Sequence, residues 1–140
     1  MARLKKKERQ LLLIEQVKEK PFLTDEELAS KLSVSVQTIR LDRLALGIPE
    51  LRGRIRKMAE TAQNKVKSIK RDDVVGELID LELGHSGISI LRITDDMVFS
   101  QSKIAKGYYM FSQANSLALA VMDTQMAVTG VANVKYKVPV

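Results

Sequence analysis

Four polar side chains lie close together in the sequence between residues 35 and 40. They are Ser35, Gln37, Thr38 and Arg40. A glutamine amide can pair with adenine through one donor and one acceptor, and an arginine can pair with the two acceptors of guanine. If one exposed helix carries these residues, they have the chemistry that reads base edges in the major groove of DNA.

Basic residues surround this cluster. Contacts to DNA phosphates position a protein without reading the sequence, and the residues that we expect to make them are Lys5, Lys6, Lys7, Lys31, Arg43 and Arg52. Residues 1–71 hold 18 Lys and Arg against 9 Asp and Glu, a net charge of +9, whereas residues 72–140 hold 5 against 8, a net charge of −3. This asymmetry indicates a module that binds a polyanion, joined to a second module. A basic helix surface that is only solvated is the alternative.

The first predicted helix covers residues 1–20 and ends before Pro21. Its apolar side chains recur on one stripe, which we expect to face a core. The stripe consists of Leu4, Leu11, Ile14 and Val17.

Two shorter helices should follow, joined by a tight turn. Thr24 and Glu27 have the spacing of a capping box, which predicts a helix that runs to Leu32 with its apolar side chains inward. Residues 33–35 form the turn, after which Ser35 caps a third helix that ends near residue 46. This is the order of elements in the helix-turn-helix motif, whose second helix enters the major groove. A three-helix bundle that binds a protein, or nothing, is the alternative.

A linker helix is predicted over residues 48–71. Gly47 should end the preceding helix, and Pro49 suits the first turn of the next. Apolar residues then recur at spacings of three and four up to Ile69, which is typical of one long amphipathic helix, or of two in series, with a narrow apolar seam.

The second half predicts strands and one buried helix, so the expected fold class is α+β. Residues 77–83 and 88–93 alternate as strands do, with a turn between them. Residues 108–122 are apolar almost all round and rich in helix formers. Residues 126–138 alternate again, which favours a further strand. A long apolar helix across an antiparallel sheet is the hot-dog arrangement, which binders of acyl thioesters and thioesterases use.

Several functions are disfavoured by what the sequence contains. It has no cysteine, so disulfides, thiolate metal sites and thiol catalysis are excluded, and a cytoplasmic location is expected. No metal site is visible, and no apolar run approaches the ~20 residues of a membrane span. An enzyme is disfavoured because residues 108–122 contain no Asp, Glu or His that could transfer a proton, while His85 lies in a turn and Asp123 follows the helix.

Four segments carry a resemblance to a known family. They are residues 24–29 (TDEELA), 37–44 (QTIRLDRL), 48–52 (IPELR) and 113–118 (QANSLA). Over essentially all 140 residues, the chain resembles the FapR family, which represses genes of fatty-acid and phospholipid synthesis in Gram-positive bacteria.

This resemblance implies a homodimer with a hot-dog effector domain, whose inducer is malonyl-CoA or malonyl-acyl carrier protein. It implies that Phe99 lies near the pantetheine, that Gly107 leaves room for the ligand and that the Asn115 amide binds it. Lys106 stands where the family pattern has an arginine that pairs with the malonyl carboxylate. Lysine keeps the charge but lacks the bidentate fork, so we expect a weaker pairing.

The sequence thus predicts a repressor with three parts: a helix-turn-helix domain over residues 1–47, a linker helix over 48–71 and a hot-dog effector domain over 72–140. The family's chains continue for further strands, so the hot-dog domain is expected to lack its last ones. No cofactor is expected besides the effector. A DNA-binding protein whose second half only dimerises is the alternative, and an enzyme similar to acyl-CoA thioesterases is the less favoured one.

Overall fold

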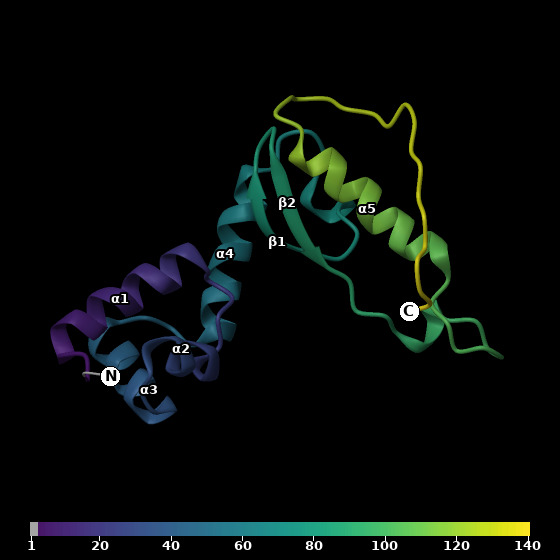
Figure 1. The fold of residues 1–140 in the computed structure, drawn as a ribbon. Coiled ribbons are helices and arrows are strands. Elements are labelled where there is room, and N and C mark those ends of the chain that lie inside the picture. Colours follow the sequence, from purple (N-terminus) through teal and green to yellow (C-terminus); the bar gives the residue numbers. More distant parts are fainter. Residues whose placement is uncertain (1–2) are drawn as a thin grey trace. The chain divides into compact units, whose positions relative to one another are not determined.

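The computed structural model describes residues 3–140 and confirms the α+β class (Figure 1). The chain divides into two compact units, the first ending at Lys57 and the second running from Met58 to Val140. The predicted domain boundaries at residues 47 and 71 remain predictions.

The first unit contains three helices and the beginning of a fourth. They are α1 (Lys6–Glu19), α2 (Asp25–Leu32), α3 (Val36–Leu46) and α4 (Leu51–Lys65). Its core consists of Leu13, Leu28, Ala29, Leu32 and Ile39, all of them buried. The prediction that the apolar side chains of residues 28, 29 and 32 face inward is therefore confirmed.

The ends of α2 and α3 form as the sequence predicts. The Thr24 hydroxyl accepts a hydrogen bond from the Glu27 amide at 3.1 Å, and the Glu27 carboxylate accepts one from the Thr24 amide at 2.8 Å. Ser33, at the end of α2, adopts a left-handed φ of 53°, which turns the chain sharply into α3. Gly47 ends α3 with a left-handed φ of 67°, a conformation that costs glycine little.

The stripe predicted for α1 is wrong in two of its positions. Leu11 is 68% exposed and Ile14 is 43% exposed, whereas the buried residues of this helix are Arg9 and Leu13. Compared with the prediction, α1 is rotated about its own axis, because Arg9 pairs with the Asp42 carboxylate of α3. Leu13 lies one turn after Arg9 and therefore faces the core. The spacing of apolar residues could not predict this rotation, because one of the two buried residues is an arginine.

Arg54 of α4 connects this helix to two loops of the first unit. Its guanidinium donates to the backbone carbonyls of Pro21 at 3.0 Å and Pro49 at 2.8 Å, and also to that of Leu23. These carbonyls lie in the loops after α1 and α3, so one buried arginine satisfies several loop acceptors that would otherwise lose their hydrogen bonds with water.

The second unit is a two-stranded antiparallel sheet with a helix packed on it. Strand β1 (Glu77–Glu82) pairs with β2 (Ser86–Ile90), and α5 (Gly107–Val121) lies across them (Figure 1). Two short 3₁₀ helices, η1 (Arg71–Asp73) and η2 (Asp95–Met97), precede and follow the sheet. Its core joins Ala62 of α4 to Leu78 and Leu81 of β1, with Leu117 and Val121 of α5 against them.

Gly87 sets the closeness of α5 to the sheet. A Cβ at this position would lie 2.9 Å from Leu117 Cδ1 and 3.0 Å from Val121 Cγ2, inside van der Waals contact. A larger residue would therefore require the Leu117 and Val121 side chains to shift.

The strand predicted over residues 126–138 is not formed. These residues carry no regular secondary structure and are mostly exposed, and in Figure 1 they run as an extended segment, coloured yellow, after α5. An alternating pattern makes a strand only where a neighbouring strand supplies hydrogen-bonding partners, and the ladder described in this unit contains β1 and β2 alone. Among residues 3–140, no helix is long and apolar enough to cross a membrane.

Candidate nucleic-acid interface

A buried ion pair fixes α3 against α1. Arg9 donates to both carboxylate oxygens of Asp42, from Nε at 2.5 Å and from Nη2 at 3.1 Å, and the Gln10 amide adds a third bond at 3.1 Å. The hydrogen bond from Arg9 holds the pKa of Asp42 below its usual value, although burial opposes this. The side chains of Arg9 and Asp42 are 10% and 3% exposed, so the pair lies inside the unit.

A second ion pair fixes α3 against the beginning of α2. Arg43 donates to the two oxygens of Asp25 at 2.7 and 2.8 Å, and to the Ile48 carbonyl at 3.3 Å. The Arg43 hydrogen bond lowers the pKa of Asp25, so this carboxylate keeps its charge further into acid than an ordinary aspartate does.

This arrangement corrects the expected role of Arg43. Its side chain is 10% exposed and faces a carboxylate, so a contact with DNA phosphate would require the pair to break. Arg43 would then lose its two close hydrogen bonds with Asp25. Arg43 therefore orients α3 from inside the unit, and the geometry does not support a phosphate contact.

The solvent-exposed part of α3 carries two of the predicted base-reading residues. Gln37 and Arg40 are exposed, and the Arg40 side chain is 54% exposed. The Nε of Arg40 lies 3.6 Å from Asp25 Oδ2, a distance that is longer than a good hydrogen bond. The carboxylate thus attracts this guanidinium while leaving it in solvent, where it can reach an acceptor outside the unit.

Ser35 and Thr38 secure the N-terminus of the same helix. The Ser35 hydroxyl accepts from the Thr38 amide at 3.1 Å and lies 2.9 Å from the Thr38 hydroxyl. Beside them is an open hollow, which Arg3 and Lys31 help to line. Both hydroxyls are therefore engaged in capping first, and any contact they make to DNA would be additional.

The remaining predicted phosphate contacts are solvent-facing. Lys5, Lys6, Lys7, Lys31 and Arg52 are all exposed. Lys5 precedes α1, Lys6 and Lys7 lie in its first turn, and Arg52 lies in the first turn of α4. Unlike the buried Arg43, these side chains are accessible to a DNA phosphate.

Three of the four predicted effector residues come together in the second unit. The Lys106 ammonium lies 6.0 Å from the centre of the Phe99 ring, and Gly107 follows as the first residue of α5. Asn115 lies eight residues further along the helix, or about 12 Å at the usual helical rise. Its carbonyl oxygen accepts a hydrogen bond from the Thr129 hydroxyl.

Tyr136 is a neighbour of this site that sequence reasoning missed. Its hydroxyl donates to the Gly107 carbonyl at 2.6 Å, and a Cβ on Gly107 would lie 3.1 Å from the tyrosine ring. The space beside Gly107 therefore holds this ring, in a hollow that Met110 and Val140 also line. No signal in the sequence pairs residue 136 with residue 107.

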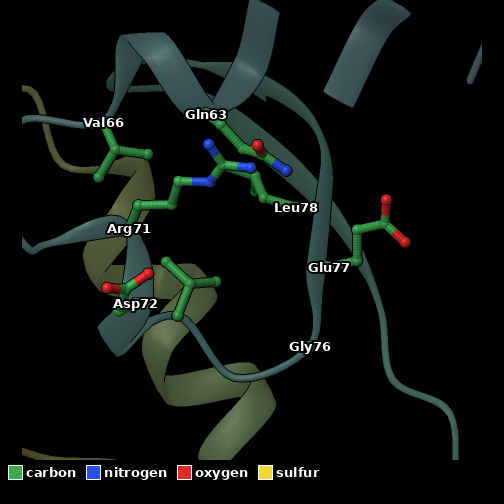
Figure 2. A pocket seen from close by; sticks show the side chains of 8 residues that line it. Gln63, Val66, Arg71, Asp72, Gly76, Glu77 and Leu78 are labelled. Carbon is green, nitrogen blue, oxygen red and sulfur yellow. The ribbon is translucent and has the colours of Figure 1, made fainter. Parts of the chain in front are cut away.

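Another hollow in the second unit, of about 360 Å³, involves none of the predicted site residues (Figure 2). Figure 2 shows the Arg71 side chain extending toward Gln63, while Glu77 points away from both. Arg71, Asp72 and Glu77 bring charges of both signs to it and are exposed, so it has the character of a solvated surface. Within residues 3–140, no group of His, Asp and Glu is arranged to hold a metal ion.

The ion-paired acids Asp25, which is partly buried, and Asp42, which is buried, were missed as well. Asp42 lies three residues after Ile39, on the buried side of α3. An acid at such a position needs a partner, and this signal could have indicated the pair with a basic residue.

No protein-family model matches the chain. Among the curated proteins, the transcription factor FapR of Caldanaerobacter subterraneus subsp. tengcongensis is 60% identical over 138 residues, which are 99% of this chain and 69% of that protein. FapR of Bacillus velezensis is 56% identical and FapR of Bacillus subtilis is 54% identical, each over 96% of this chain and 72% of the relative. Identities of this size over nearly the whole chain cover both units.

Proposed function

Because this chain belongs to the FapR family of transcription factors, we propose that it represses genes of fatty-acid and phospholipid synthesis by binding palindromic operator DNA as a homodimer. Malonyl-CoA or malonyl-acyl carrier protein would release it. The family consists of regulators and not of enzymes, in agreement with the prediction from the sequence.

The observation that supports this proposal is the exposure of Gln37 and Arg40 on the outward face of α3. A buried ion pair at Asp42 and a partly buried one at Asp25 hold the inward side of the helix. They leave Gln37 and Arg40 in solvent, with exposed lysines elsewhere on the unit. We interpret α2, the turn at Ser33 and α3 as a helix-turn-helix, whose second helix enters the major groove.

The second unit would regulate DNA binding by binding the effector. A helix on an antiparallel sheet agrees with a hot-dog domain, and Lys106 beside Phe99 offers a cation for a malonyl carboxylate. Effector binding releases DNA only to the extent that the effector binds the released state more tightly than the DNA-bound state. The dimer, the palindrome and the effector are parts of the proposal.

The test is an electrophoretic mobility shift with promoter DNA of fatty-acid synthesis genes. The full chain is titrated onto this duplex in the presence of malonyl-CoA, acetyl-CoA or neither. The proposal predicts that malonyl-CoA weakens binding at least tenfold and that acetyl-CoA, which lacks the carboxylate, has little effect.

Two results would contradict different parts of the proposal. Equal binding with and without malonyl-CoA would leave a DNA-binding protein whose second half only dimerises. Equal binding to promoter DNA and to a scrambled duplex would remove the operator-reading role itself.

A further inference from the structure

The outward face of α3 carries two leucines as well as the polar residues. Leu41 is 57% exposed and Leu44 is 75% exposed. With 3.6 residues per turn, Gln37, Leu41 and Leu44 lie on one side of the helix, opposite its buried side. Two large apolar side chains thus occupy the surface that lies furthest from the core of the unit.

Single exposed leucines are ordinary on protein surfaces. Leu41 differs because it lies one turn after Gln37 and next to Arg40, on the face that the proposed function directs into the major groove. In that groove, thymine is the base that presents a methyl group. An apolar side chain among hydrogen-bonding ones therefore has one natural partner there.

We propose that Leu41 reads thymine by packing against its 5-methyl group, beside the base pair that Gln37 or Arg40 contacts. This inference rests on the proposed function. The charge of the surface favours a nucleic acid over a protein as its partner, because the exposed Arg40 lies beside this face and Lys31 lies near the beginning of the helix.

Leu44 is not assigned the same role. Recognition helices meet base edges with their N-terminal residues, and Leu44 lies near the C-terminal end of α3. It lines a hollow in which Arg40 and Arg43 lie with Asp25 and Glu50, so charges of both signs surround it. Leu44 therefore serves as a matched control, being a leucine at least as exposed on the same helix.

The experiment begins with duplexes of 30 base pairs that the full chain enriches from a random pool. Affinity is then measured by fluorescence anisotropy for the enriched duplex and for the same duplex with deoxyuridine in place of every thymidine. This replacement removes only the 5-methyl groups and keeps the base pairing. The proteins are the wild type, Leu41→Ala and Leu44→Ala, with circular dichroism as a check that each is folded.

We expect the wild type and Leu44→Ala to bind the uridine duplex about three- to fivefold more weakly for each contacted thymine, the loss that follows from uncovering one methyl group. Leu41→Ala should bind the two duplexes nearly equally. Single uridine replacements should then locate the effect at one thymine in each half-site.

The inference would be overturned if the wild type bound both duplexes alike, or if Leu41→Ala kept the full preference for thymidine. Either result leaves the proposed function intact, provided that the enriched duplex still binds better than a scrambled one. Failure to enrich any duplex would instead overturn the proposed function, and with it the assignment of Leu41.

Discussion

Asp25 connects two arginines that have different roles. It forms two close hydrogen bonds with the buried Arg43, and it lies 3.6 Å from the exposed Arg40. The first arginine positions α3, and the second remains in solvent, where it can donate its fork to guanine.

The role of Arg40 is tested by Arg40→Ala, with Arg52→Ala as the contrast. A base-reading arginine contributes roughly 1–3 kcal/mol to discrimination between bases, whereas a phosphate contact contributes about equally on every sequence. Arg40→Ala should therefore weaken binding to the enriched duplex about tenfold more than binding to a random duplex, in anisotropy titrations. Equal losses on both duplexes would remove Arg40 from base reading.

Asp42 should make the first unit sensitive to acid. Its pKa is lowered in the folded chain by the hydrogen bond from Arg9, so the unfolded chain binds a proton more readily. The stabilisation is fully present above the ordinary aspartate pKa of about 4, and it is lost as the pH falls through the lower folded value.

The matching experiment is chemical denaturation of Asp42→Asn and wild type at pH 7 and at pH 3. We expect the substitution to cost about 3 kcal/mol at pH 7, because it leaves a buried arginine without its charge partner. The difference should shrink at pH 3. A constant difference would show that the ion pair does not cause it.

Lys106 tests the proposed effector site at the same scale. Lys106→Ala should weaken malonyl-CoA binding about tenfold in calorimetry, because the cation that faces the carboxylate is lost, while DNA binding without effector is unchanged. Lys106→Arg should restore or increase the affinity, since arginine supplies a bidentate fork. Unchanged affinity in both variants would place the ligand elsewhere.

At the scale of elements, α3 depends on its cap. Ser35 accepts a hydrogen bond from the Thr38 amide, which the first turn of the helix cannot satisfy by itself. Ser35→Ala should lower the free energy of unfolding by about 1 kcal/mol. Ser30→Ala, at an exposed position in α2, is the control and should cost less than half as much. A cost no greater than that of the control would exclude a capping role.

The elements that could be predicted are those with local signals. The strand β1 and the helix α5 followed from alternation and apolar composition within their own residues. The bounds of α2 and α3 followed from Thr24, Glu27, Ser35 and Gly47, because capping involves residues a few positions apart. The rotation of α1 could not be predicted in this way, since it depends on a pair between Arg9 and Asp42 across 33 positions. The failed strand at residues 126–138 has the same cause, because pairing with another strand is also a long-range property.

The site residues, too, differ in whether a local pattern or a distant partner determines their place. Gln37 could be assigned from the sequence because helical periodicity places it opposite Ile39, whereas Arg40 lies about 100° from Ile39, at the side of the helix. Arg43 was assigned wrongly, although it lies four residues after Ile39 and therefore on the buried side of α3. Its partner Asp25, 18 positions away, could not be identified from the sequence. Tyr136 could not either, because its contact with Gly107 joins an irregular segment to the beginning of α5.

At the scale of the whole molecule, the positive charge and the residues proposed to read DNA bases both lie in the first half of the chain. Residues 1–71 have a net charge of +9 and residues 72–140 a net charge of −3. The basic part would supply affinity for any duplex through counterion release, and the outward face of α3 would supply the preference for one sequence. These two contributions respond differently to salt and to base changes, so one titration separates them.

That titration is the affinity of the full chain for the enriched duplex and for a scrambled one, measured between 50 and 300 mM salt. We predict a preference of at least 1,000-fold for the enriched duplex, and a linear fall of log affinity against log salt for both with a slope of about −0.9 for each phosphate contact. Equal affinity for the two duplexes, together with no dependence on salt, would contradict the claim that α3 and its basic surroundings bind and read DNA.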